Sequence, residues 1–314
     1  MINNNNKTFI TLNNGTTMPL LGLGTWLTKP GEAEHAIRTA LENGYRHIDA
    51  AAIYRNEKEI GNTLDALINQ EHKFKREDIY VTSKLWNTFH AKEHVRKACL
   101  QTLKDLKLDY LDMYLIHWPL PFAYVGDDIQ KDENCFPKDE NGKIRIASVP
   151  LRETWEEMEK LVQDGLVKSI GVSNFDLGLI YDLLTYAKIK PACNQVECHP
   201  FLAQNNLIKG QKDIALVAYS PLGHMYEGSP AHHSKIKEIA EKHNKTPAQI
   251  LLRWNIQRGC VVIPKSTNEQ RIIENGKVFD FELDSEEMEA INDLQKEKTV
   301  RTCDPVTFWD LPLW

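Results

Sequence analysis

Four polar side chains lie at the ends of three short apolar runs in the first third of the chain. Asp49 ends the first run, and Tyr54 follows it by five residues. Lys84 closes the run 79–83, and His117 closes the run 113–116. If the runs are successive buried strands, an acid, a phenol, an amine and an imidazole meet at one rim. Such a set of proton donors favours the reduction of a carbonyl group.

The expected role of each of the four residues follows from the ordinary pKa values of their side chains. A carbonyl oxygen that gains charge as hydride arrives needs a proton, and a free tyrosine, with a pKa of about 10, is a weak donor near neutral pH. A nearby ammonium stabilises the phenolate and lowers that pKa. We therefore expect Lys84, held by Asp49, to tune Tyr54, and a neutral His117 to orient the carbonyl by a hydrogen bond.

Each of these residues also has an ordinary structural interpretation. A single histidine such as His117 is more often packed in a core. A lysine at a strand end is usually solvated, and Asp49 could hold a turn. What favours the joint interpretation is that all four fall at the exits of successive strands.

The chain alternates short apolar runs with longer amphipathic segments. The predicted strands cover 20–25, 45–51, 79–85, 111–118, 167–173, 192–197, 215–220 and 261–265. The predicted helices cover 31–43, 57–68, 92–106, 151–164, 176–186, 202–210, 233–243 and 247–258. Strands that alternate with helices pair in parallel, and eight units predict a closed (β/α)8 TIM barrel. The alternative is an open doubly wound sheet, which is disfavoured because no third glycine follows Gly22 and Gly24 to complete a dinucleotide-binding motif.

Several segments stand outside this alternation. Residues 8–11 and 16–18, joined by Asn13-Asn14-Gly15, predict an N-terminal β-hairpin across the barrel floor. A long polar loop, 119–150, follows the fourth strand, an extra helix covers 283–296, and a tail rich in aromatic residues covers 297–314. The loop and the tail could both wall a pocket at the end where the strands exit. We expect 1–314 to form a single barrel domain, with 1–6 as a disordered lead-in.

The composition excludes several classes of function. A net charge of −6 gives no basic surface for nucleic acid. No apolar run approaches the roughly 18 residues that span a membrane, and the first residues lack the core of a signal peptide. Six cysteines without a C-x-x-C pair indicate free thiols in a reducing compartment, which favours a cytoplasmic location. No residue spacing predicts a metal site.

Four spaced segments resemble the signatures of the aldo-keto reductase family. They are 44–54, 115–119, 171–175 and 263–266, read together with the strand–helix order from about residue 8 to the end. Within the family the chain is most similar to the aldose and aldehyde reductases. The resemblance implies the roles argued above for Asp49, Tyr54, Lys84 and His117, and it implies a monomeric enzyme.

The resemblance also implies a cofactor, since nothing in the four residues stores a hydride. Ser173, Asn174 and Gln195 match positions that hold a nicotinamide carboxamide, and Tyr219 matches the ring on which the nicotinamide stacks. Ser220 and Leu222 begin a further cofactor-binding segment. After it, 224–229 is shorter than the loop that aldose-type relatives fold over the cofactor pyrophosphate.

At the far end of the expected cofactor site, three residues match family positions that bind the adenosine 2′-phosphate: Lys265, Ser266 and Arg271. Glu274 and Asn275 match adenine contacts. Two cations and a hydroxyl suit a dianion, so NADPH is favoured over NADH.

The substrate pocket is implied to have aromatic walls. Trp26 and Trp118 match two of them, Phe308 and Trp309 could add to them from the tail, and Cys303 falls near a thiol position at the rim. The implied partner is a small carbonyl substrate, an aldehyde first, with sugars and ketones as further candidates. Two alternatives stay open: a cofactor-sensing binding module on the same fold, and alcohol oxidation with NADP.

Overall fold

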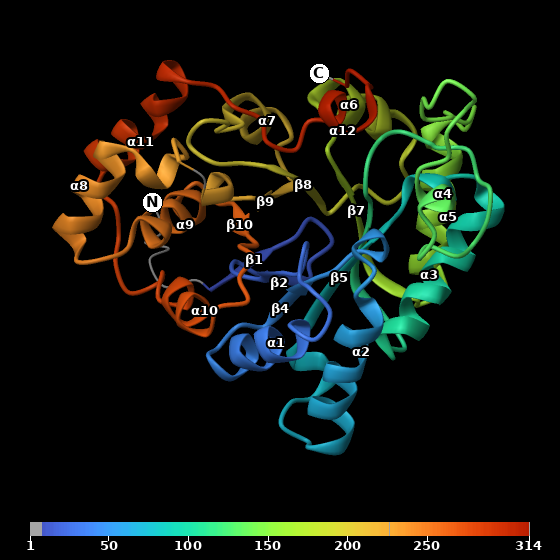
Figure 1. The fold of residues 1–314 in the computed structure, drawn as a ribbon, viewed down its shortest axis with the longest axis horizontal. Coiled ribbons are helices and arrows are strands. Elements are labelled where there is room, and N and C mark those ends of the chain that lie inside the picture. The colour runs from blue at the N-terminus through green and yellow to red at the C-terminus, as the bar shows by residue number, and fades with distance from the viewer. Residues whose placement is uncertain (1–7, 226, 314) are drawn as a thin grey trace.

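The described chain forms one parallel β-barrel surrounded by helices (Figure 1). The computed structural model describes residues 8–225 and 227–313. The expected lead-in, 1–6, lies outside the described residues. Within them the sheet runs in the order of the chain through eight strands: β3 (Leu23–Gly24), β4 (His47–Asp49), β5 (Tyr80–Leu85), β6 (Leu111–Ile116), β7 (Val167–Ser173), β8 (Cys193–Glu197), β9 (Ala215–Tyr219) and β10 (Val261–Val262).

The first and last strands meet and close the barrel. Parallel bridges join Leu21 to Val262 and Gly24 to Lys265. Around them, the amide of Gly22 donates to the carbonyl of Val262 at 2.9 Å, and the amide of Val262 donates to Leu20 at 2.9 Å. The predicted TIM barrel is therefore confirmed, and the open-sheet alternative is wrong.

Helices follow most strands and pack on the outside of the barrel (Figure 1). The helices are α1 (Ala33–Glu42), α2 (Glu57–Asp65), α3 (Lys92–Leu106), α4 (Asp132–Cys135), α5 (Leu151–Gln163), α6 (Leu177–Tyr186), α7 (Asn205–Gly210), α8 (Ser234–His243), α9 (Pro247–Gln257), α10 (Glu269–Gly276), α11 (Ser285–Glu297) and α12 (Pro305–Trp309). No helix of the described chain is both long and apolar enough to cross a membrane.

The sequence analysis missed α10. This helix has only 8 residues and buries only Ile272 and Asn275, so its amphipathic pattern is too short for a periodicity search to detect. The start of α10 could nevertheless have been predicted, because asparagine is a favoured N-cap residue. In the structure Asn268 is the N-cap and accepts a hydrogen bond from the amide of Arg271. α10 is therefore the helix that follows the last barrel strand, β10, and the predicted elements lacked this helix.

The hairpin closes the end of the barrel where the strands begin. β1 (Phe9–Thr11) pairs antiparallel with β2 (Thr17–Pro19). In the turn, Asn14 Nδ2 donates to Ser169 Oγ at 2.8 Å, and Asn13 Nδ2 donates to the carbonyl of Pro191 at 2.8 Å. Both acceptors lie near the starts of β7 and β8, so the predicted cover of the barrel floor is confirmed.

One close helix contact depends on a missing side chain. Gly61, in α2, faces the end of α3, and a Cβ added to it would stand 2.2 Å from the carbonyl oxygen of Asp105 and 2.7 Å from the backbone of Leu106. Real Cβ atoms do not approach backbone this closely. The two helices can therefore pack at this distance only with glycine at 61.

We predict that Gly61→Ala lowers the free energy of unfolding by about 1–3 kcal/mol, because the methyl group must push α2 and α3 apart. Gly178→Ala is the matched control. It also adds a methyl group to a helical glycine, but its nearest neighbour is Asp176 Oδ1 at 3.3 Å, so it should stay within about 1 kcal/mol of the parent chain. Urea unfolding measures both, and equal effects would contradict the packing argument.

Candidate active site

Three consecutive strands deliver the four candidate residues to one place. Asp49 is the last residue of β4, Lys84 lies in β5 one residue before its end, and His117 directly follows β6. Tyr54 ends a short 3-10 helix, η1 (Ala52–Tyr54), that follows β4. Parallel strands all end at the same rim of a barrel, so the side chains converge there. Asp49, Tyr54 and His117 line a single cavity of about 1550 Å³. Lys84 is 0% exposed and reaches this group through its hydrogen bonds to Asp49 and Tyr54.

Lys84 and Asp49 form a buried ion pair at the centre of this group. Lys84 Nζ donates to Asp49 Oδ2 at 2.7 Å, to the carbonyl of Ala50 at 2.8 Å and to Tyr54 Oη at 3.3 Å. The second carboxylate oxygen, Asp49 Oδ1, accepts from Gln195 Nε2 at 2.8 Å. The two charged side chains are 0% and 3% exposed. Every proton of the ammonium and both oxygens of the carboxylate therefore have a partner, which burial of the charges requires.

The acidity of Tyr54 differs from the expectation. Burial, reinforced by the carboxylate of Asp49 and by Cys303, raises the pKa of Tyr54 well above its ordinary value. The expected net lowering by Lys84 is therefore wrong for this structure, because desolvation of the phenolate outweighs an ammonium whose charge is shared with Asp49. The phenol keeps its proton across the neutral range, as a proton donor must.

His117 is held as a neutral imidazole. Burial, with the ammonium of Lys84 in addition, keeps the pKa of His117 well below its usual range. Its ring lies edge-on to Tyr54 at 5.8 Å and to Trp86 at 5.4 Å between centroids. Asn174 Nδ2 donates to its carbonyl at 2.9 Å, and its Nδ1 is buried without a hydrogen-bond partner. The imidazole ring of His117 is thus fixed in position, and the protein does not use all of its hydrogen-bonding groups.

A second polar group faces the first across the barrel mouth. Ser173 ends β7 and donates from Oγ to the carbonyl of Gln195 at 2.7 Å. Asn174 donates to Ser173 Oγ at 3.1 Å and accepts from Tyr219 Oη at 2.8 Å. Asn174 has a φ of +64°, a left-handed conformation that asparagine tolerates better than most residues. Amides, a hydroxyl and an aromatic ring therefore stand together, as the sequence analysis expected.

The remaining candidate cofactor residues divide into two sets. Those on the cavity wall are Ser220, Leu222, Lys265 and Arg271. The structure does not bring Ser266, Glu274 and Asn275 to the wall. Ser266 caps the approach to α10 by accepting from the amide of Asn268. Glu274 bonds within α10 to Gln270, and Asn275 is buried.

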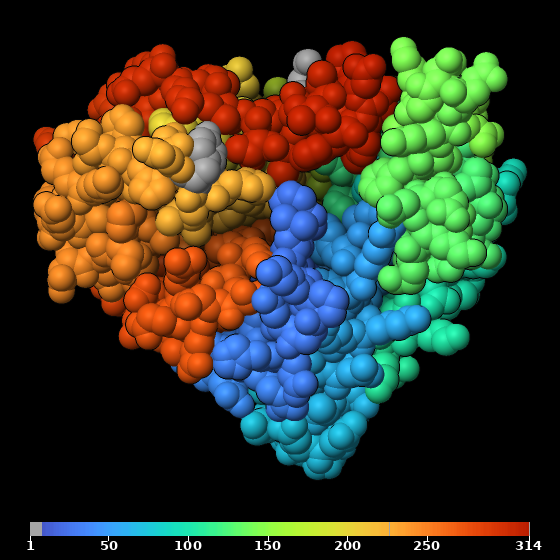
Figure 2. Space-filling view, viewed as in Figure 1, coloured from blue at the N-terminus to red at the C-terminus, as the bar shows by residue number. Residues whose placement is uncertain are grey.

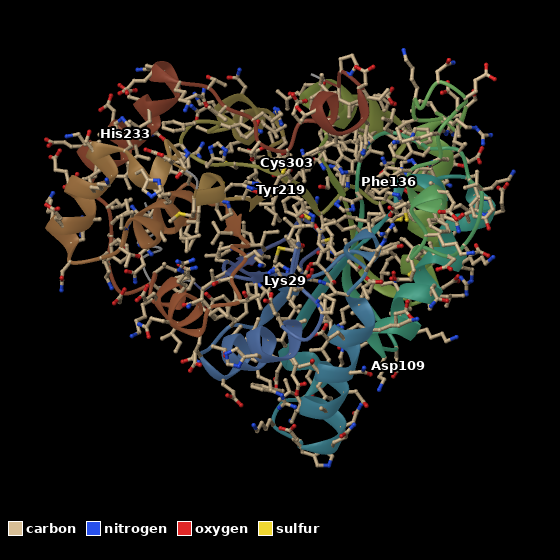
Figure 3. The ribbon with its side chains drawn as sticks, viewed as in Figure 1. Lys29, Asp109, Phe136, Tyr219, His233 and Cys303 are labelled. Carbon is tan, nitrogen blue, oxygen red and sulfur yellow. The ribbon has the colours of Figure 1, made fainter. Side chains whose placement is uncertain are left out.

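The aromatic wall of the cavity comes from loops and from the C-terminal tail. Trp26, Trp118, Cys303, Phe308 and Trp309 all line it, as expected from the sequence. Figure 2 shows the red tail and the green segment that contains the long loop after β6 on either side of a hollow in this face. Figure 3 shows Cys303 beside Tyr219, with Phe136 on the side of the green loop.

The sequence analysis overlooked two aromatic residues of this wall, Trp86 and Phe136. Trp86 follows the end of β5, and its ring lies edge-on to His117 and, at 6.0 Å, to Trp309. Its indole N–H donates to the carbonyl of Cys135 in the long loop at 2.9 Å. Its place two residues after Lys84 was a usable signal, because it occupies the same strand exit. The loop and the tail are thus both packed on a residue of the catalytic rim.

The cavity suits a dinucleotide and a small substrate together. Its volume exceeds the roughly 300–1000 Å³ of a typical small-molecule site. Its wall carries the proton donors Tyr54 and His117, the amides of Asn174 and Gln195, and the cations Lys265 and Arg271. This set of groups offers hydrogen bonds to a carboxamide and positive charge to phosphate. The residues present therefore fit a nicotinamide dinucleotide that bears phosphate groups.

A closed parallel barrel that carries a buried Lys–Asp pair, a phenol and a neutral imidazole at its mouth defines an oxidoreductase class. Comparison with known proteins agrees. The family model described as "Aldo/keto reductase family" matches residues 20–296. Aldose reductase B of Dictyostelium discoideum is 51% identical over 300 residues, covering 95% of this chain and 94% of its own length.

Two further relatives support the same assignment. Aldo-keto reductase family 1 member A1 of Gallus gallus is 48% identical, covering 92% of this chain and 89% of its own length. The solved structure of the aldose reductase from Schistosoma japonicum superimposes with a TM-score of 0.90 at 45% identity, covering 98% of this chain and 99% of that one. The chain belongs to the aldo/keto reductase family, and it is a nicotinamide-dependent oxidoreductase.

We predict that Lys84→Met lowers the free energy of unfolding by about 3–5 kcal/mol, because it leaves the Asp49 carboxylate buried without its counter-ion. Adding Asp49→Asn should restore part of that loss, since the unpaired charge is then removed. Urea unfolding of the two single variants and the double variant measures the coupling. Strictly additive losses would contradict a direct charge pair.

Proposed function

We propose that this protein reduces aldehydes to alcohols with NADPH, with Tyr54 as the general acid. The observation that carries the proposal is the continuous hydrogen-bonded chain from Asp49 through Lys84 to Tyr54, beside the neutral ring of His117. The close relatives named as aldose reductases favour the same activity. Sugars and ketones are further candidate substrates.

In the proposed reaction, the reduced nicotinamide supplies the hydride. The residues of this chain manage the proton and the charge. Tyr54 gives its phenolic proton to the carbonyl oxygen, and the ammonium of Lys84, 3.3 Å from Tyr54 Oη, stabilises the phenolate that remains. Asp49 keeps that ammonium charged and in place. His117 orients the carbonyl oxygen toward Tyr54 by a hydrogen bond.

The other polar groups are assigned to the cofactor. Ser173, Asn174 and Gln195 would hold the carboxamide of the nicotinamide, and Tyr219 would stack on its ring. Lys265 and Arg271 would bind the 2′-phosphate, with Ser266, Glu274 and Asn275 nearer the adenosine. Within the described residues, no ion pair of Lys265 or Arg271 competes with such a phosphate.

The intact set of proton donors disfavours a cofactor sensor without catalysis, and the comparisons favour the reductase direction over alcohol oxidation. We also propose that 1–314 acts as a single-domain monomer in the cytoplasm. The six cysteines support a reducing compartment, since all are free and buried in the structure.

The first test removes the acid. Tyr54→Phe should lower kcat for an aldehyde by at least about 10²-fold, the usual contribution of a general acid, because the ring stays but the proton is gone. NADPH binding, measured by quenching of tryptophan fluorescence, should hardly change. Tyr181→Phe, on the outer face of α6 and 53% exposed, is the matched control. Turnover that survives in Tyr54→Phe would mean that another group is the acid.

The second test concerns the choice of cofactor. Lys265→Ala combined with Arg271→Ala should weaken NADPH binding by about 10- to 100-fold, since hydrogen bonds to a charged phosphate are lost. NADH, which lacks the 2′-phosphate, should bind nearly as before. Lys277→Ala removes a nearby exposed cation that does not line the cavity and serves as the control. Equal weakening of the two cofactors would place the 2′-phosphate elsewhere.

A further inference from the structure

A buried carboxylate at the end of β8 binds the start of the C-terminal tail. Glu197, the last residue of β8, is 0% exposed. It accepts hydrogen bonds from the amide of Thr302 at 2.8 and 3.0 Å, from the amide of Cys303 at 2.9 Å and from the hydroxyl of Thr302. Nε2 of His199, itself 1% exposed, lies 2.9 Å from Glu197 Oε1. Most of these partners come from the tail.

The carboxylate and the tail depend on each other. Burial by itself would raise the pKa of Glu197, but the hydrogen bonds from His199, Thr302 and Cys303 lower it to about 2, so the group is ionised. An ionised carboxylate in such a place is stable only while its donors are seated. Conversely, loss of the carboxylate would leave two buried main-chain amides without an acceptor.

From this anchor the chain runs directly into the wall of the cavity. Cys303 lines the cavity. Asp304 caps α12 by accepting from the amide of Val306 at 3.0 Å. The helix ends at Trp309, whose ring lies edge-on to Trp118 at 5.1 Å between centroids. Because only a few residues separate the anchor from Trp309, a fixed start of the helix fixes the position of that ring.

We propose that Glu197 is a positioning residue that, through the tail, makes the cavity favour aromatic aldehydes over small aliphatic ones. By fixing residues 302–303, it holds Trp309 against Trp118 at the cavity wall, where edge-on indole rings favour a flat aromatic substrate. A small aliphatic aldehyde needs only the four catalytic candidates, which are Asp49, Tyr54, Lys84 and His117. Its binding does not depend on this aromatic wall. This inference rests on the proposed function.

The kinetic test uses benzaldehyde and propanal as substrates with NADPH. Glu197→Gln should raise KM for benzaldehyde by up to about tenfold, the effect expected when the substrate loses its aromatic contact with a displaced Trp309 ring. The KM for propanal and both kcat values should change by less than about twofold. Glu297→Gln, a 62% exposed glutamate of α11, is the matched control. An equal rise of KM for both aldehydes, or no rise, overturns the proposal.

A double-mutant cycle tests whether Glu197 acts through the tail. If it does, Glu197→Gln should add little to the benzaldehyde KM of Trp309→Ala, because the ring that it positions is already gone. Fully additive effects would overturn the proposal. Thr302→Val removes only the hydroxyl donor and should give a smaller change in the same direction, so the test stays available if Glu197→Gln folds poorly.

Limited trypsin digestion tests the anchor without any substrate or cofactor. No lysine or arginine follows Arg301, so cleavage there releases the peptide 302–314, which mass spectrometry identifies. Glu197→Gln and Thr302→Val should release it faster than the parent chain and than Glu297→Gln. Equal rates in all four proteins would overturn the anchor. Because this measurement needs no turnover, it separates a failed anchor from a failed proposal of aldehyde reduction.

Discussion

The buried pair of Lys84 and Asp49 is the constraint on which the rest of the site depends. Both charges lie almost fully out of contact with solvent, so every polar atom of the pair needs a protein partner. Those partners are Ala50, Gln195 and Tyr54, which come from β4, β8 and the 3-10 helix after β4. Only a closed barrel brings these elements within hydrogen-bonding reach. The hydrogen bonds that stabilise the buried pair therefore require the barrel fold as well as the catalytic residues.

Much of the architecture was readable from the sequence, because buried parallel strands appear as short apolar runs with polar residues at their ends. The positions of Asp49, Lys84 and His117 followed from that pattern. Helix limits also followed where punctuation is explicit. Thr246 and Gln249 form a capping box at the start of α9, and Gly259, with a φ of +80°, follows its end.

What the sequence did not reveal depends on contacts between distant segments. The amphipathic pattern of α10 is too short to detect, and the role of Trp86 appears only when the tail packs on it. The acidity of Tyr54 was predicted in the wrong direction, because a pattern of charges says nothing about how deeply a phenol is desolvated. The role of Glu197 gave no signal, since its partners in the tail, Thr302 and Cys303, lie more than 100 residues away.

The contact between Glu197 and the tail uses chiefly main-chain amides. A backbone N–H is present in every amino acid except proline, so this attachment places almost no demand on which residues follow it. Natural substitutions after residue 303 can therefore change the side chains that line the pocket, while the barrel and its proton donors remain the same. The residues that carry out the reaction thus lie on the barrel, while the residues that select the substrate lie on a tail that can change independently.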